Sequence, residues 1–178
     1  MKTKRLTRIA LMAALISVLA PVSVPLAGEV PVSLATFAVM LAGCALGAKD
    51  GAAAAAVYLL LGAIGIPVFA GYTSGFSILF GVTGGFLFGY IVLAMICGYV
   101  YRKFGSAAKG KMKFVWMTAA MLLGNLVLYT LGVIWFVFVT QYPLSVAMTA
   151  CVIPFIPGDI LKMILVNAVI PGLEKVIR

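Results

Sequence analysis

The sequence contains no histidine, and its three cysteines, Cys44, Cys97 and Cys151, lie in separate apolar segments without a CxxC spacing. Zinc and haem sites are usually built from histidine or from closely spaced cysteines, so no metal site is expected. We expect the cysteines to be small buried residues. The phosphate-binding pattern GxxxxGK[ST] is also missing, so the chain should hold no nucleotide cofactor and should not itself hydrolyse ATP.

Charge is scarce as well. Only 10% of the 178 residues are charged, whereas 65% are hydrophobic. Soluble domains contain about 25% charged and roughly 45–50% apolar residues. Because a soluble globule cannot bury this much apolar surface, the composition indicates an integral membrane protein in contact with lipid. The net charge of +9 comes from basic residues at the ends of apolar segments, which is typical of topology signals and not of a nucleic-acid partner.

Six apolar segments are expected to form helices, although a bilayer core of about 30 Å needs roughly 20 helical residues to cross it and some segments are short. The sequence predicts an all-α membrane protein, with one domain over residues 1–178 and six transmembrane helices. The helices are expected at Thr7–Pro21, Ser33–Gly47, Ala52–Ile64, Gly84–Tyr101, Phe114–Thr140 and Gly158–Val169. The last can extend to Ile177, with a kink near Pro171.

The sequence also predicts the structure of the segments between these helices. Ala48–Gly51 is predicted to form a tight turn, and Leu144–Val152 a short surface or re-entrant helix. Pro21, Pro25 and Pro31 mark a loop that carries Glu29. The basic start followed by an apolar run resembles a secretory signal, but no cleavage site of small residues follows, so we interpret it as a retained helix.

Glycine is concentrated between Gly62 and Gly89. Irregular backbone at membrane depth is tolerated only where protein buries it or where it lines a cavity, so this region is expected to fold over a pocket. The alternative for Gly81–Gly85 is a turn whose glycines serve helix packing. Aromatic residues surround the glycines and could form either core or the wall of an apolar pocket; they are Phe69, Tyr72, Phe76, Phe86 and Tyr90.

The positive-inside rule suggests an orientation. With six spans and a cytoplasmic amino terminus, both termini are cytoplasmic and every basic residue except Lys162 lies on the cytoplasmic side. Lys162 is then placed near the outer side, together with the glycine-rich region.

Asp159 and Lys162 form the most conspicuous polar feature, within Pro154–Lys162. A charge inside a bilayer costs at least about 2.5–3.5 kcal/mol and usually faces a protein interior or a cavity. If Pro157 takes the first helical position, Asp159 lies in the first turn and shares a face with Lys162. One interpretation is a self-neutralising pair that caps and orients the last helix. The other is a ligand site, in which Asp159 accepts N–H groups and Lys162 meets a carboxylate; both can hold.

Ala10 and Ala14 give the first helix a face of small residues four positions apart. Such a face allows another helix to approach closely. It could serve internal packing or the docking of a partner.

Several motifs together resemble the BioY family, the biotin-specific substrate-binding (S) components of energy-coupling factor (ECF) transporters. They are residues 30–34 (VPVSL), 65–71 (GIPVFAG), 81–89 (GVTGGFLFG) and 154–162 (PFIPGDILK). The family usually has proline where this chain has Val82, a change that leaves Thr83, Gly84 and Gly85 in place.

The resemblance implies a six-helix S-component in the bacterial cytoplasmic membrane, with a biotin pocket near the outer face. It implies ATP hydrolysis only on partners: a transmembrane coupling (T) subunit and two ATP-binding-cassette subunits. Carried onto this chain, Ala10 and Ala14 match the docking motif, and the ligand-binding residues are expected to be Asp159, Lys162, Thr83, Gly84, Gly85, Phe69, Gly71 and Tyr90. We expect Asp159 to receive the ureido N–H groups of biotin and Lys162 its carboxylate.

Other functions stay open at this point. The chain could be an S-component for a different vitamin or small carboxylate, or a biotin transporter that works alone. An intramembrane enzyme using Lys162 as a base or nucleophile is disfavoured, because neither histidine nor a second nearby carboxylate accompanies it. A purely structural scaffold would not need an acid and a base at the outer end of a helix.

Overall fold

The computed structural model describes residues 2–24 and 30–177, so Pro25 and Glu29 lie outside the described residues. Helices account for most of it: α1 (Lys2–Leu19), α2 (Ala35–Leu46), α3 (Ala48–Ala63), α4 (Phe76–Leu79), α5 (Gly84–Val100), α6 (Lys111–Thr140), α7 (Leu144–Cys151) and α8 (Phe155–Ile177). The short elements are strands β1 (Ser23–Val24) and β2 (Val32–Ser33), the 3₁₀ turn η1 (Ala70–Tyr72) and the π turn η2 (Tyr101–Gly105).

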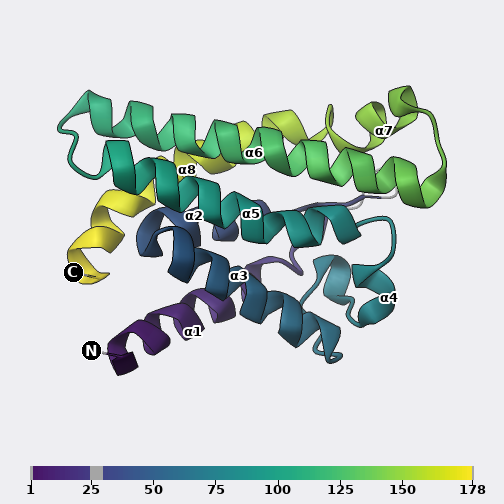
Figure 1. Cartoon of the computed structure of the whole chain (residues 1–178), viewed down its shortest axis with the longest axis horizontal. Coiled ribbons are helices and arrows are strands. Elements are labelled where there is room, and N and C mark those ends of the chain that lie inside the picture. The colour runs from purple at the N-terminus through teal and green to yellow at the C-terminus, as the bar shows by residue number, and fades with distance from the viewer. Residues whose placement is uncertain (1, 25–29, 178) are drawn as a thin grey trace.

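Helix α5 lies at the centre of the bundle and packs against α2, α3 and α6 (Figure 1). Glycines permit these close approaches. A Cβ on Gly43 of α2 would lie 2.5 Å from the backbone oxygen of Ala94 on α5, and one on Gly98 would overlap the backbone at Gly47 and Ala48. Small residues therefore hold the helices together, as is usual where lipid offers no hydrophobic driving force for helix association.

Three helical segments are long and apolar enough to cross a bilayer: Gly84–Gly105, Lys111–Thr140 and Phe155–Lys175. Helix α6, with 30 residues, has a length of about 45 Å at 1.5 Å per residue, which exceeds a bilayer core of about 30 Å. Its outer face exposes Leu126, Ile134 and Phe138. Soluble monomers rarely expose such a continuous apolar surface, so this face suits lipid.

The bundle contains the six longer helices that the sequence predicts, but α1, α2 and α3 have only 18, 12 and 16 residues. These three do not meet the length and hydropathy of a full span within the described part of the chain. Both termini lie at one end of the bundle, opposite to α4 and α7 (Figure 1). The protein is a multi-pass helical membrane protein.

Several predicted boundaries are wrong, among them the start of α6, which begins at Lys111 and not at Phe114. Ala48–Gly51 is helical, because Gly47 alone, with a φ of 88°, makes the reversal between α2 and α3. The first helix begins at Lys2 and not at Thr7, and its Arg5 forms an ion pair with Asp50 of α3. Helix α8 begins at Phe155, before Pro157. The predicted end of α6 at Thr140 is confirmed, and the short helix predicted at Leu144–Val152 is present at Leu144–Cys151.

Candidate ligand-binding site

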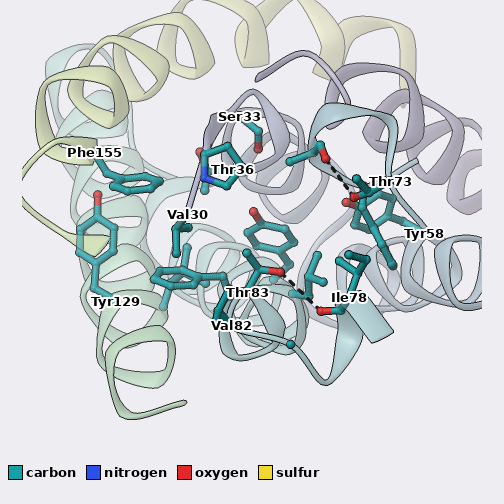
Figure 2. A pocket seen from close by; sticks show the side chains of 18 of the residues that line it. Val30, Ser33, Thr36, Tyr58, Thr73, Ile78, Val82, Thr83, Tyr129 and Phe155 are labelled. Atoms are coloured by element: carbon teal, nitrogen blue, oxygen red, sulfur yellow. Dashed lines mark hydrogen bonds between the residues drawn. The ribbon is translucent and has the colours of Figure 1, made fainter. Parts of the chain in front are cut away.

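A cavity of about 290 Å³ lies beneath the segment that joins α3 to α5. This volume is close to the lower end of the roughly 300–1,000 Å³ found for small-molecule sites. Helices α2, α3, α5, α6 and α8 contribute to its lining (Figure 2). The lining residues are Val30, Pro31, Ser33, Thr36, Tyr58, Phe69, Ala70, Thr73, Ser77, Ile78, Gly81, Val82, Thr83, Phe86, Leu87, Tyr90, Leu128, Tyr129, Phe155, Asp159 and Lys162.

The segment over the cavity is a folded loop. Gly65, Gly71 and Gly75 all have positive φ values, which only glycine adopts without strain. The amide of Gly71 donates to the carbonyl of Pro21, and that of Gly75 donates to Gly62. Phe69 and Thr73 form an antiparallel bridge between these points. The prediction that the glycine-rich region folds over a pocket is therefore confirmed.

Aromatic side chains form much of the wall. The rings of Tyr58 and Phe69 meet edge to face at 5.6 Å, and Tyr90 lies 6.4 Å from Tyr58. The rings of Phe86 and Phe155 stack at 6.3 Å on another side. Figure 2 shows Tyr129 and Phe155 across the cavity from Tyr58 and Thr73. Flat, rigid walls of this kind suit an apolar ring or alkyl chain.

Asp159 and Lys162 are both buried, with 2% and 5% of their surface exposed. Lys162 Nζ donates to Asp159 Oδ1 at 2.8 Å, so the prediction that the two share a helix face is confirmed. Lys162 also donates to Thr36 Oγ1 at 2.9 Å, and the Thr36 hydroxyl donates to the same Asp159 oxygen at 3.0 Å. Tyr129 donates its hydroxyl to Asp159 Oδ2.

This network joins three helices, because Thr36 belongs to α2, Tyr129 to α6 and the charged pair to α8. Asp159 lies in the second turn of α8, and no acidic residue occupies the first turn. The interpretation that Asp159 caps the helix is therefore wrong, whereas the self-neutralising pair is real. Burying two charges costs several kcal/mol per ion unless further hydrogen bonds compensate, and Thr36 and Tyr129 supply those bonds.

The sequence pattern did not single out Thr36 and Tyr129. One sequence feature could have indicated Thr36 as a site residue: it is a polar residue in an otherwise apolar helix. Tyr129 had no distinguishing signal in the sequence, since tyrosine is common in membrane helices. Tyr58 and Ser33 were also missed; Ser33 accepts a hydrogen bond from the amide of Ala35, where α2 begins.

Thr83, Phe69 and Tyr90 line the cavity together with Asp159 and Lys162. Phe69 is 1% exposed and packs on Gly62, where any Cβ would overlap its ring. The Thr83 hydroxyl donates to the carbonyl of Ile78 at 3.5 Å.

The three glycines predicted for the site are placed differently. Gly71, Gly84 and Gly85 are not among the described residues that line the cavity. A Cβ on Gly84 or Gly85 would overlap Leu79 or Trp135, so both serve the packing of α5 against its neighbours. Gly71, with a φ of 69°, serves the turn of the loop.

Ala10 and Ala14 lie on the exposed face of α1, whereas Ala13 and Ile16 face the bundle. Ala13 therefore serves the packing of α1 within the bundle, and Ala10 and Ala14 do not. The cysteines are all buried, as expected.

Comparison with known proteins agrees with this architecture. The family model for the BioY family matches residues 1–178. Biotin transporter BioY2 of Lactococcus lactis subsp. cremoris is 41% identical over 93% of this chain and 87% of its own length. Biotin transporter BioY of Thermotoga maritima is 36% identical over 97% of this chain and 96% of its own.

A solved structure shares the fold at a TM-score of 0.89. It is the crystal structure of the S-component for biotin from an ECF-type ABC transporter. It is 29% identical to this chain, and the match covers 98% of this chain and 92% of the other. Sequence and fold thus agree over nearly the whole length, and the chain belongs to the BioY family.

Proposed function

We propose that the chain is the biotin-binding S-component of an ECF transporter. The observation that carries the proposal is the buried pair of Asp159 and Lys162 lining an aromatic cavity in a fold of this family. The family is one of transporters, so the chain is not expected to transform its ligand.

The geometry favours one orientation of biotin. Asp159 and Lys162 are bonded to each other at 2.8 Å, so they meet the same end of a ligand and not opposite ends. A carboxylate brought to Lys162 would also approach the Asp159 carboxylate, and like charges repel strongly in a site shielded from water. The neutral ureido ring avoids this repulsion. Its N–H donates to Asp159, and its carbonyl oxygen accepts from Lys162.

The rest of the ligand then extends along the aromatic walls. The thiophane ring and alkyl chain contact Tyr58, Phe69 and Phe86. Lys162 is the only basic residue in the described lining, so the ligand carboxylate meets neutral donors. The Ser77 hydroxyl lines the loop side of the cavity and can provide one. The Thr73 and Thr83 hydroxyls also lie there, but each must turn away from the carbonyl to which it now donates, Ala70 and Ile78 respectively. The sequence had suggested that Asp159 receives the ureido N–H groups of biotin and Lys162 its carboxylate. In the orientation proposed here, both residues meet the ureido ring.

The energy for transport would come from other subunits. The exposed alanines of α1 support docking of a coupling T-subunit, because small residues allow a partner helix to approach closely. Two ATP-binding-cassette subunits would complete the complex. The basic residues at the end of the bundle that holds both termini support a cytoplasmic position for that end.

Calorimetric titration of the purified chain tests the substrate. Biotin should bind with a Kd below about 1 μM, equivalent to more than about 8 kcal/mol. Biotin amide, which lacks the carboxylate charge but keeps the ureido ring, should retain most of this affinity. Absence of biotin binding, with binding of a different vitamin, would refute the substrate. Loss of all affinity for the amide would refute the orientation.

A further inference from the structure

A second hollow, of about 490 Å³, lies at the opposite end of the bundle from the ligand cavity. It is formed where α1, the junction of α2 and α3, and the end of α5 meet, near the end that holds both termini (Figure 1). Its lining includes four basic residues, Arg5, Lys49, Arg102 and Lys103, and one acidic residue, Asp50, a net charge of +3. Arg5 and Asp50 form an ion pair with each other.

The other three basic residues form no ion pair within the described ranges 2–24 and 30–177; they are Lys49, Arg102 and Lys103. Arg102 donates to the backbone carbonyl of Ala45 at 3.1 Å, and Lys103 donates to the hydroxyl of Tyr99 at 3.3 Å. Both acceptors are neutral. Because like charges repel when they are gathered in one place, this arrangement favours the binding of an anion.

A role in membrane topology does not by itself explain why these residues converge. The positive-inside rule requires only that basic residues lie on one side of the membrane. Here they come from α1, α3 and η2 and line the same hollow. Close packing holds them together: a Cβ on Gly47 would lie 2.9 Å from Arg102 Nε, and one on Gly98 would overlap the backbone at the start of α3.

An apolar stripe runs along α5 away from the hollow. Phe88, Met95 and Tyr99 are all exposed, and their spacing places them on one helix face with Lys103. Lys103 Nζ lies 5.4 Å from the centre of the Tyr99 ring, so the stripe reaches the basic residues. The segment Gly84–Gly105 is long enough to cross a bilayer, and Lys103 near its end therefore lies at the level of the lipid headgroups.

Helix α3 carries a second apolar stripe that starts at the same hollow. Lys49 is exposed in its first turn, and Val57 and Leu60 are exposed on the same face further along. Helices α3 and α5 pack against each other. Basic residues at headgroup level beside apolar helix surfaces match the chemistry of a phospholipid, which has an anionic group and acyl chains. A soluble anion or an acidic protein segment would leave the apolar stripes unused.

We propose that this hollow binds the headgroup of an anionic phospholipid. Its phosphate lies between Lys49, Arg102 and Lys103, and its acyl chains lie along the exposed stripes of α3 and α5. The bound lipid links α3 to η2 and holds this end of the bundle in the headgroup layer. The inference does not rest on the proposed function, because biotin takes no part in it.

Titration of lipid into the detergent-purified chain, followed by native mass spectrometry, tests the site. The wild type should bind phosphatidylglycerol more tightly than phosphatidylcholine, which has no net charge. The double variant Lys49→Gln, Lys103→Gln should bind phosphatidylglycerol about 30-fold more weakly, the contribution of two basic residues near an anionic headgroup. Its affinity for phosphatidylcholine should not change. Equal binding of the two lipids by the wild type would overturn the inference.

The matched control is the double variant Lys109→Gln, Lys111→Gln. It removes the same charge from two exposed lysines that do not line the hollow, so its affinity for phosphatidylglycerol should stay within about threefold of the wild type. An equal loss in both double variants would mean that net charge alone attracts the lipid, and the proposed site would be refuted. All four lysines are exposed, so the Tm without lipid should match that of the wild type.

A single variant keeps the test decisive if the first double variant does not fold. Lys103→Gln alone should weaken phosphatidylglycerol binding about fivefold. Wild-type affinity in this variant would contradict the site.

Two further measurements distinguish a lipid from other anions. Glycerol 1-phosphate carries the phosphate without acyl chains and should not displace phosphatidylglycerol at an equal concentration. Displacement would indicate a site for soluble phosphates and refute a lipid site. If the wild type shows no preference for phosphatidylglycerol while the Lys49, Lys103 variant loses co-purification with a coupling T-subunit, the hollow docks an acidic segment of a partner and the inference is wrong.

Discussion

At the scale of single residues, removing one member of the buried pair should cost more stability than removing both. Asp159→Leu leaves Lys162 as an uncompensated buried charge, and such changes cost about 3–5 kcal/mol. Adding Lys162→Met should restore most of the lost stability, because an apolar pair of similar volume needs no compensation. Both variants should lose biotin binding. Chemical denaturation in detergent, with titration of each variant, measures the two effects.

Equal stability of the single and double variants would contradict the coupling that the 2.8 Å contact implies. Recovery of binding in the double variant would instead show that the pair is only structural.

Tyr129 offers a milder test of the same network. Tyr129→Phe removes the hydroxyl that donates to Asp159 Oδ2 and keeps the ring that lines the cavity. Loss of a hydrogen bond to a charged group should lower stability by about 1.5–3 kcal/mol. Tyr142→Phe is the control, because Tyr142 is 47% exposed and lies outside the network, and its stability should not change.

At the scale of helices, the shape of the cavity depends on glycines where α5 and α6 meet. A Cβ on Gly132 of α6 would overlap the ring of Phe86, which lines the cavity. Gly132→Ala should push this ring toward the ligand and cost about 1–3 kcal/mol through overpacking. Both Tm and biotin affinity should fall.

Gly172 of α8 is the matched control, since a Cβ there meets nothing within 4 Å. Gly172→Ala should leave affinity unchanged and raise stability by up to about 1 kcal/mol through helix propensity. If Gly132→Ala binds biotin as well as Gly172→Ala does, the ring of Phe86 does not shape the site.

At the scale of the whole molecule, the exposed face of α1 should determine assembly and not ligand binding. Ala14→Trp should abolish co-purification with a coupling T-subunit, because the large ring prevents close helix approach. Titration should give the wild-type biotin affinity. Leu126→Trp places the same side chain on an exposed position of α6 and should leave assembly intact. Unimpaired assembly of the Ala14 variant would contradict this docking face.

The orientation in the membrane is a second property of the whole molecule. In a background with the three buried cysteines replaced by alanine, Tyr142→Cys should react with a membrane-impermeant maleimide in intact cells. Lys109→Cys, at the other end of α6, should react only after permeabilisation. The reverse pattern would place the basic end of the bundle outside and refute the positive-inside assignment.

The sequence alone determined what depends on local pattern. Composition indicated a membrane protein, and apolar runs located the six longer helices, with ends that shifted where Gly47 and Phe155 became the true boundaries. The spacing of Asp159 and Lys162 predicted their contact, since residues three apart on a helix are neighbours. The glycine-rich motif predicted a folded loop over a pocket, and the combination of motifs predicted the family.

Only the tertiary structure decided what completes the site. Thr36 lies 123 residues before Asp159, and Tyr129 lies 30 before it, so no local pattern could pair them. Helix packing also gave Gly84 and Gly85 a role outside the cavity lining. The physical reason is the separation in sequence between the residues that interact. Helix formation and charge pairing within a turn depend on nearby residues, whereas the surroundings of a buried charge depend on how separate helices pack.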